Sequence, residues 1–460
     1  MASRRQTDLT TRKANTARDL ALDVLLSVET RGAYSNLALT NALRHTRLDS
    51  RDVGLATELV YGTIGRLNTI DFYLTPLLKT PLHQLEDWVR NLLRLTVYQL
   101  MYLDRVPPFA AINEAVEIAK RRGAKASGFV NGVLRSFLRK KDDIKMPSRE
   151  RNWVKRISLE HSHPEWMVKL WETTYGRETA EAICIANNVR PKVTLRVNSH
   201  RLTRDELLQQ LLDAGVQAHA SEVSPYGVLL DQGLDVAKLP AFQEGLCTVQ
   251  DESSMLVAQA LAPEKGMRVL DCCAAPGGKT THLAELMGDE GEVFAVDIHE
   301  HKIELIFNVA DRLGLQSITA QAGDIRDVVG EAGQFDSILL DAPCSGLGVI
   351  RRKPDLKWGK VPGDIAEIAG IQRDLLHTVA GALKPGGVLV YSTCTVAPEE
   401  NEAMIAEFLA LHPEFSGDPL QPHLPAEIMA GASPDAFSVQ IFPQQYESDG
   451  FFIARLRRNS

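Results

Sequence analysis

Apolar residues in the first third of the chain recur with helical spacing. Across residues 14–140 they return every three or four positions, as in ARDLALDVLLSVE and DVGLATELVYGTIGR, and Gly and Pro mark the breaks between segments. Strand-like alternation of apolar and polar residues does not compete with this spacing. The pattern predicts an all-α domain over residues 1–145.

The pattern changes after Lys145. A polar, irregular stretch leads into a further helical segment, and the sequence from residue 193 to 230 then predicts a strand, a helix and a strand. Thr203, followed three residues later by Glu206, predicts a capping box at the start of that helix. We expect a linker and a small α+β subdomain over residues 146–240. An RNA-recognition-type sheet is compatible with this order, although the aromatic-rich sheet motif of that module is absent.

Short apolar runs alternate with helical segments from residue 241 to the end. This alternation predicts a parallel, doubly wound sheet in an α/β Rossmann-like domain over residues 241–460. A final hairpin is predicted from FSVQIFP and GFFIARLRR, at the edge of the sheet. The other candidate strands are Arg268–Cys272, Glu292–Asp297, Ile318–Ala322, Phe335–Asp341 and Gly387–Ser392.

Composition narrows the class of protein. The 460 residues, 44% hydrophobic and 24% charged, are enough for several domains with cores of their own. No apolar run approaches the roughly 18 residues of a membrane span, and the polar start MASRRQTDLTTRK lacks the apolar core of a secretion signal. Six cysteines without CxxC spacing favour reduced thiols over disulfides or a zinc site. We expect a cytoplasmic protein with no metal and no membrane partner.

Charge is divided unevenly along the chain. Residues 1–145 carry 23 Lys and Arg against 15 Asp and Glu, a net charge of +8, which leaves −16 for the remainder of a chain of net charge −8. A basic module beside an acidic one suits an anionic macromolecular partner, because phosphate contacts supply most of such affinity. A solvated helical surface would explain the same charges, so charge alone does not decide.

The stretch MRVLDCCAAPGGKTT predicts a strand, a tight loop and a helix start, and its paired glycines let a ligand approach the backbone. A P-loop would need glycine where Cys273 stands, and a dinucleotide fingerprint needs a third glycine that is absent. The remaining candidate is S-adenosylmethionine, whose amino-acid part can lie over the glycines. Asp297, about 20 residues further on, is placed to meet the ribose hydroxyls.

Acidic residues also follow the other candidate strands. Asp271, Asp297, Asp324 and Asp341 come at four successive strand ends, where open α/β sheets bind their ligands. A single such residue is more often a helix cap. Four together favour one common site, and we expect the adenine to lie near Asp324.

Two cysteines just past adjacent strands indicate the reaction. Cys344 lies in DAPCSGLG and Cys394 in YSTCTVAPEEN. A lone cysteine is usually a buried packing residue, but two beside a cofactor loop favour chemistry. Carbon 5 of cytosine becomes nucleophilic only after a thiolate adds at C6, and covalent catalysis of this kind needs a cysteine. An amine or hydroxyl acceptor would not need one.

Cys394 is the better candidate for the nucleophile. Residues 398–400 look like the first turn of a helix, and a thiol near a helix N-terminus ionises more readily. Asp341 can donate a proton to the N3 and amino edge of the base, if burial tunes its protonation, or hydrogen-bond that edge, and Cys344 can assist the loss of H5 that releases the enzyme. A basic loop follows the Pro-Cys motif. It predicts RNA phosphate contacts from Arg351, Arg352, Lys353 and Lys357.

Two resemblances extend these predictions. The segments VPPFAAINEA and GFVNGVLR resemble the NusB-type antitermination fold, an RNA-binding helical bundle. The segments DCCAAPGGKT, DAPCSGLGVIRRKPDLKW and STCTVAPEENE resemble the motifs of the RNA 5-methylcytosine methyltransferases, and with a NusB-like front domain the chain is similar to their Sun/Fmu type over nearly its whole length. That family implies Cys394 as nucleophile and Cys344 in release. It also implies S-adenosylmethionine binding by Cys273, Ala274, Ala275, Pro276, Gly277, Gly278, Lys279, Asp297, Asp324 and Asp341.

The predicted function is therefore methylation of C5 of one cytosine in 16S ribosomal RNA through a Cys–C6 intermediate. The expected partner is that RNA, unassembled or partly assembled into the small subunit, and the protein is expected to be a monomer. Two alternatives stay open at this point. One is a non-catalytic RNA-binding or antitermination factor, and the other is the same chemistry on transfer RNA, because a NusB-like domain favours ribosomal RNA only by analogy.

Overall fold

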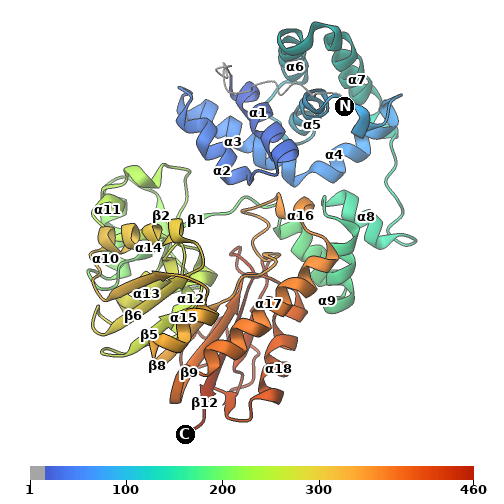
Figure 1. Ribbon diagram of the computed structural model, residues 1–460. Coiled ribbons are helices and arrows are strands. Elements are labelled where there is room, and N and C mark those ends of the chain that lie inside the picture. The colour runs from blue at the N-terminus through green and yellow to red at the C-terminus, as the bar shows by residue number, and fades with distance from the viewer. Residues whose placement is uncertain (1–15) are drawn as a thin grey trace, which may run out of the picture. The chain divides into compact units, whose positions relative to one another are not determined.

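The structure is a computed structural model that describes residues 16–460 (Figure 1). The predicted lack of a secretion signal concerns residues 1–13, which lie outside the described residues. The chain forms two compact units: one runs to Asn188 and includes Lys353–Gly359, and the other holds Val189–Arg352 and Lys360–Ser460. This division falls inside the segment 146–240 that the sequence predicts as linker and small subdomain.

The first unit is helical, as the apolar spacing predicts. Side-chain caps start several helices: Thr16 accepts from the amide of Asp19, and Asp49 from that of Asp52, while Gly32 ends the first helix with φ of 63°. The buried apolar side chains between Ala17 and Phe137 form one core. The helices are α1 Ala17–Arg31, α2 Ser35–Arg44, α3 Ser50–Gly65, α4 Leu67–Leu74, α5 Asp87–Tyr102, α6 Pro108–Gly123, α7 Ser127–Lys140, α8 Trp153–Glu160, α9 Glu165–Ala186, which breaks at Gly176, and the short α16 Leu356–Gly359.

The second unit begins with a small antiparallel sheet of order β2-β3-β1-β4. Its elements are β1 Val193–Val197, α10 Arg204–Asp213, β2 Ala218–Ala220, β3 Gly227–Leu230, α11 Pro240–Gln243 and β4 Cys247–Val249. The predicted capping box is confirmed, because Thr203 accepts from the amide of Glu206 while the Glu206 carboxylate accepts from the amide of Thr203. The predicted second strand is in fact two strands, β2 and β3.

The larger sheet has the order β10-β12-β9-β8-β5-β6-β7, with β11 paired to β12. Strands β5 to β9 are parallel, and β10, β11 and β12 join antiparallel. The predicted hairpin is confirmed as β11 and β12, but β12 lies between β9 and β10 rather than at the edge. The bounds are β5 Arg268–Asp271, β6 Glu292–Asp297, β7 Ile318–Ala322, β8 Phe335–Asp341, β9 Leu383–Thr393, β10 Phe415–Gly417, β11 Ser438–Ile441 and β12 Phe451–Arg458.

Helices cover both faces of this sheet. Side chains of α12 Glu252–Leu261, α13 Gly278–Leu286 and α14 Glu300–Leu313 pack with alternate strand residues such as Val269 and Val293. Side chains of α15 Ile325–Ala332, α17 Pro362–Ala380 and α18 Glu402–Leu411 pack with the intervening ones, such as Leu270 and Val296 (Figure 1). Burial on both faces explains the nearly continuous apolar strands. Within residues 16–460, no helix is long and apolar enough to cross a membrane.

Candidate active site

The strand order has a switch point at β5. This strand pairs with β6 on one side and β8 on the other, so the connections that leave them diverge and a crevice forms at their carboxyl ends. Asp271 ends β5, Asp297 ends β6 and Asp341 ends β8, while Cys394 directly follows β9. The topology therefore brings the predicted cofactor acids and the predicted nucleophile to one edge of the sheet.

The loop after β5 is built for close backbone approach. The amide of Ala274 donates to Val296 O at 2.9 Å, and that of Gly277 donates to Ala274 O at 2.8 Å. Gly277 has φ of +102°, and a Cβ there would lie 3.1 Å from Ile306 Cα of α14. Gly278 begins α13, and nothing within 4 Å would meet a Cβ added to it. The first glycine therefore permits the turn and the helix packing, and the second leaves an open backbone at a helix N-terminus.

The acidic residues at the other strand ends differ in their partners. Asp297 is 7% exposed and accepts from the amides of Ala275 at 3.2 Å and His299 at 3.1 Å, so it also holds the glycine loop. Asp324 caps α15, and its hydrogen bonds and ion pair with Arg326 lower the pKa of its carboxyl. Asp324 is thus a helix cap in this structure, and its contact with a cofactor stays a prediction.

Asp271 lies beneath the loop. Thr280 donates to its Oδ2 at 2.7 Å, while its Oδ1 is buried without a hydrogen-bond partner. Burial raises the pKa of this carboxyl from the usual 3.8 to about 7. Cys272 is buried in the core of the sheet, and the pKa of the Cys273 thiol is raised by burial and then by the charge of Asp271. These two cysteines are neutral wall and packing residues.

Lys279 and Asp341 form an ion pair across the crevice. The Lys279 ammonium donates to Asp341 Oδ2 at 2.8 Å and lies 5.0 Å from the centre of the Phe451 ring. Ser392 donates to the other oxygen of Asp341, also at 2.8 Å. Burial alone would lower the pKa of Lys279, but the charge and hydrogen bond of Asp341 outweigh it and raise the pKa. Lys279, which the sequence predicts as a cofactor ligand, is therefore directed at the predicted base contact.

The two predicted reactive thiols are neighbours. Cys344 Sγ lies 3.3 Å from Cys394 Sγ, and both are free cysteines. The hydrogen bond with Cys394 and then burial raise the pKa of Cys344 well above its ordinary range. Lys279 also interacts electrostatically with Cys394. The two sulfurs are thus within hydrogen-bond distance, and either thiol can be the donor.

A buried carboxylate joins the loop of Cys344 to the segment after Cys394. Glu400 Oε2 accepts from the amide of Ser345 at 2.8 Å and from the side-chain amide of Gln372 at 2.9 Å. Gln372 also donates to Pro343 O at 2.9 Å. Burial raises the pKa of Glu400. These contacts fix the backbone on both sides of Cys344, and sequence reasoning missed them.

Asn401 has the same effect on the loop of Cys394. Its Oδ1 accepts from Thr393 Oγ1 at 2.6 Å, and its Nδ2 donates to Thr395 O at 3.1 Å and to Gln440 Oε1 at 2.7 Å. Cys394 is thus flanked by two residues that one buried amide holds. Glu400 and Asn401 stand in the motif quoted from the sequence. The only sequence feature that indicates their role is that they are polar at positions where a helix was expected to begin.

The expected helix N-terminus beside Cys394 needs correction. Pro398–Glu400 forms a separate 3-10 turn, and α18 begins only at Glu402. A macrodipole acts within the first turn of a helix, so α18 is not the source of activation for a thiol eight residues earlier. The charged side chain that interacts electrostatically with Cys394 is Lys279.

The predicted phosphate-binding rim is also corrected in part. Arg351 is buried and donates to Pro443 O at 2.7 Å, and Arg352 pairs with Asp449 and with Asp251, each at 2.7 Å. These guanidinium groups therefore join their loop to residues 443–449 and to Asp251, and their donors are directed at internal acceptors. Lys353 is exposed, and its contact with RNA stays a prediction.

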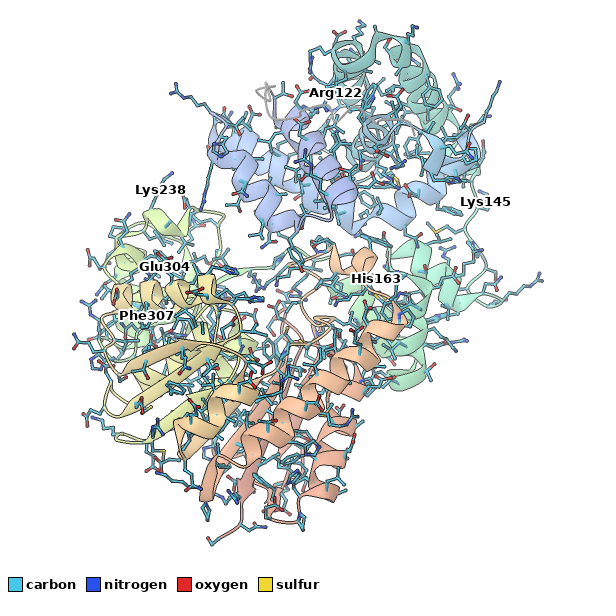
Figure 2. All side chains as sticks on the ribbon, in the orientation of Figure 1. Arg122, Lys145, His163, Lys238, Glu304 and Phe307 are labelled. Atoms are coloured by element: carbon cyan, nitrogen blue, oxygen red, sulfur yellow. The ribbon has the colours of Figure 1, made fainter. Side chains whose placement is uncertain are left out.

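Lys357 is not a surface cation. It lies in the first unit, is 0% exposed, and donates to Gly65 O and Ser162 O at 3.0 Å and to Asn188 Oδ1 at 2.9 Å. Trp358 beside it donates to Ile64 O at 2.7 Å. His163, labelled in Figure 2, is buried in the same unit, and burial and then the Lys357 charge lower its pKa. The prediction of a phosphate contact for Lys357 is wrong, because three internal oxygens occupy its ammonium.

Comparison with known proteins places this geometry in a family. The family described as "16S rRNA methyltransferase RsmB/F" matches residues 258–457, and the "NusB family" matches residues 15–139. A "Probable ribosomal RNA small subunit methyltransferase B" of Bacillus subtilis is 45% identical over 454 residues, which are 97% of this chain and 99% of that protein. The chain belongs to the RsmB/F family of rRNA methyltransferases.

Three further comparisons agree with this assignment. A "Ribosomal RNA small subunit methyltransferase B" of Klebsiella pneumoniae is 38% identical over 96% of this chain and 98% of its own length. The crystal structure of a protein named PH0851 superposes with a TM-score of 0.80 at 26% identity, over 96% of this chain and 99% of that one. A ferredoxin-like domain of the same family matches residues 163–237. The predicted fold class is confirmed: a NusB-like bundle, a ferredoxin-like middle part and a Rossmann-like methyltransferase domain.

Proposed function

We propose that this rRNA methyltransferase transfers a methyl group from S-adenosylmethionine to C5 of one cytosine in 16S ribosomal RNA, through a covalent bond between Cys394 and C6 of the base. The observation that carries the proposal is the pair of thiols 3.3 Å apart at strand ends, beside the Lys279–Asp341 ion pair. Amine or hydroxyl methylation would leave such a thiol pair without a role.

The thiol pair can divide the reaction into two steps. In the first, the Cys394 thiolate adds to C6, and the electron pair of the C5–C6 double bond makes C5 nucleophilic. Cys344 keeps its proton at this stage, because its hydrogen bond with Cys394 raises its pKa. Cys394 is proposed as the nucleophile because it directly follows β9 and interacts with the Lys279 ammonium, and Cys344 lies within hydrogen-bond distance of its sulfur.

The second step reverses the bond to the enzyme. After C5 gains the methyl group, H5 leaves as a proton, the C5–C6 double bond forms again, and the Cys394–C6 bond breaks with its electrons returning to sulfur. Once Cys394 is a thioether, it no longer competes for the proton of Cys344, and the Cys344 sulfur lies beside the adduct. Cys344 is therefore placed to assist the loss of H5.

Asp341 and Lys279 can orient the base. A carboxylate that accepts from Lys279 and Ser392 retains acceptor capacity for the cytosine amino group. The adjacent ammonium can stabilise the charge that develops on the ring as the thiolate adds. Both groups are fixed before the base arrives.

The loop after β5 fits an S-adenosylmethionine cradle. Gly278 leaves its backbone open at the start of α13, where amide groups favour a carboxylate. Asp297 at the end of β6 can accept from ribose hydroxyls. When bound there, S-adenosylmethionine supplies the methyl group. Asp324 and Cys273 would line the adenine and the cradle wall respectively.

Substrate identity is tested with labelled cofactor. The purified protein is incubated with labelled S-adenosylmethionine and either free 16S rRNA, assembled small subunits or transfer RNA, and the RNA is digested to nucleosides. We expect label in 5-methylcytidine from free or partly assembled 16S rRNA. Label in another nucleoside overturns the chemistry, and label in transfer RNA alone overturns the substrate. Absence of transfer to any RNA would favour a non-catalytic RNA-binding factor.

Light scattering of the same purified protein tests whether it is the expected monomer.

The roles of the two thiols are tested by substitution. Cys394→Ser should abolish turnover and covalent adducts, because the hydroxyl is a far weaker nucleophile. Cys344→Ala should form the adduct and release it slowly, so that protein and RNA migrate together on a denaturing gel. Trapping by the Cys394 variant instead would reverse the two roles.

A further inference from the structure

Arg196 of β1 is the most completely enclosed guanidinium of the second unit that the structure describes. Its side chain and that of Glu285, its ion-pair partner, are both 0% exposed. Nε and Nη2 donate to the two oxygens of Glu285 at 3.1 and 2.7 Å, which is the bidentate geometry of a strong pair. An isolated buried pair of this kind contributes little net stability compared with apolar packing. Its remaining contacts therefore suggest another role.

One of those remaining contacts is a hydrogen bond to Gln250 Oε1, just after β4, and the others lie on α13, the helix that follows the cofactor loop. Besides Glu285, Arg196 donates to Thr281 Oγ1 at 3.0 Å and to the carbonyl of Gly278. Residues 278, 281 and 285 lie on one face of α13 and span about 10 Å of helix axis. One guanidinium thus holds both the first and the last turn of α13. Gly278 is also the open glycine of the proposed cradle.

The small sheet reaches the second cofactor helix as well. Asn198, just after β1, donates to Leu313 O at the end of α14 at 2.9 Å. In the other direction, Arg312 of α14 donates to Phe242 O and Cys247 O, each at 2.8 Å. Helix α14 follows Asp297, the proposed ribose ligand. Both helices that carry cofactor groups are therefore fixed to the same small sheet by buried polar contacts.

These contacts also show whether either face of the small sheet is open to bind RNA bases. Thr194 and Arg196 of β1 and Thr248 of β4 are buried, and Tyr226 before β3 packs edge-on against His282 of α13. The opposite face holds the apolar side chains of Leu195 and Val197 against α10. An RNA-recognition sheet needs one open face for base stacking. Base stacking on this sheet is therefore not expected, because both of its faces are covered.

We propose that Arg196 is a positioning residue for the S-adenosylmethionine site, through which the small antiparallel sheet fixes the first turn of α13 in its cofactor-binding geometry. This inference rests on the proposed use of S-adenosylmethionine. Helix N-terminal amides bind a carboxylate only when they converge on it, and Gly278 has no side chain to restrain it. The guanidinium at its carbonyl supplies that restraint.

The test removes the Arg196–Glu285 ion pair without leaving an unpaired buried charge. In Arg196→Met/Glu285→Leu both charged partners are replaced by apolar side chains of similar size, so the protein should stay folded. We expect the Kd for S-adenosylmethionine, measured by calorimetry without RNA, to rise about tenfold or more, since a hydrogen bond to a charged group is lost. Hydrogen exchange of the peptide 273–281 in the ligand-free protein should speed up. Arg196→Lys, which keeps the charge but not the fork, should lie between the two.

A matched control separates positioning from stability. Arg455 of β12 pairs with Asp418 at 2.7 Å and donates to Leu261 O of α12 at 3.0 Å, so it is also a buried arginine that binds a carboxylate and a helix carbonyl. Arg455→Met/Asp418→Leu should leave the Kd unchanged. An unchanged Kd in the folded Arg196 double variant, or an equal rise in the control, overturns the proposal. If the unmodified protein does not bind S-adenosylmethionine, the proposed function itself fails.

Discussion

The two sides of the active-site edge are held in place by different means. On the cofactor side, after β5 and β6, the backbone determines the shape: Gly277 adopts φ of +102° and the amide of Ala275 binds Asp297. On the thiol side, after β8 and β9, buried side chains do so, chiefly Glu400 and Asn401.

This difference separates two kinds of failure. A change of backbone freedom should affect how tightly the methyl donor binds and leave the thiols in register. A change in the network of Glu400 and Asn401 should affect the thiols and leave the donor site intact. Measuring cofactor affinity and covalent adduct formation separately can therefore assign a defect to one side.

Among the substitutions that distinguish the two sides of the active-site edge, Glu400→Ala is expected to have the largest effect on activity. The substitution leaves the Ser345 amide and the Gln372 side chain without their acceptor, so the Cys344 loop can move away from Cys394. A displacement of about 1 Å in a reacting group can cost on the order of 100-fold in rate. We expect kcat and adduct formation to fall by about that factor, with the Kd for S-adenosylmethionine unchanged.

Glu399→Ala is the matched control, because Glu399 is the same residue type one position earlier and is exposed. It should retain full activity. A Glu400→Ala protein that binds cofactor weakly while forming adducts at the normal rate would contradict the division between the two sides.

A smaller effect on the other side is expected from Gly277→Ala. The added methyl group strains a residue with positive φ by about 1–2 kcal/mol and presses on Ile306. We expect the Kd for S-adenosylmethionine to rise about tenfold, while adduct formation on RNA changes little. Gly314→Ala is the control: this glycine has φ of +75° at the end of α14, with nothing within 4 Å of an added Cβ. It should lower the melting temperature and leave the Kd as it is.

The smallest effect concerns the pH dependence of stability. Burial raises the pKa of Asp271 from 3.8 to about 7, so the folded state binds this proton more tightly than the unfolded state. The resulting stability is present below the unfolded pKa and is lost as pH rises through about 7. Asp271→Asn does not titrate. Its melting temperature minus that of the unmodified protein should therefore increase between about pH 4 and about pH 8. A difference that stays constant with pH would show that Asp271 is not a buried titrating group.

Much of the fold could be predicted from periodicity alone. Strands β6, β7 and β8 have the predicted bounds because each apolar run ends at or just before an acidic residue. The place of β12 inside the sheet could not be predicted, because β10, its outer neighbour, is only three residues long. So short a segment carries no periodic signal.

The positions of candidate site residues could be predicted where the residue type and its place in the sequence pattern together indicate one role. Paired cysteines at strand ends and the glycines of a tight loop are of that kind. Arg196, Glu400 and Lys357 are not, because their roles depend on buried partners far away in the sequence. Arg196 looked like an ordinary strand residue and Lys357 like part of a basic surface loop. A charge in a sequence does not reveal whether water or three carbonyl oxygens surround it.

The segment Lys353–Gly359 has a consequence for how the protein is made. The oxygens of Gly65, Ser162 and Asn188 leave the ribosome long before the Lys357 ammonium that they enclose. During synthesis the helical unit is therefore incomplete for more than 160 residues of translation. The helical unit is complete only after the second unit has been partly synthesised, when Lys357 reaches these three acceptor oxygens. The last native contacts of the unit that is synthesised first therefore depend on residues from the second half of the chain.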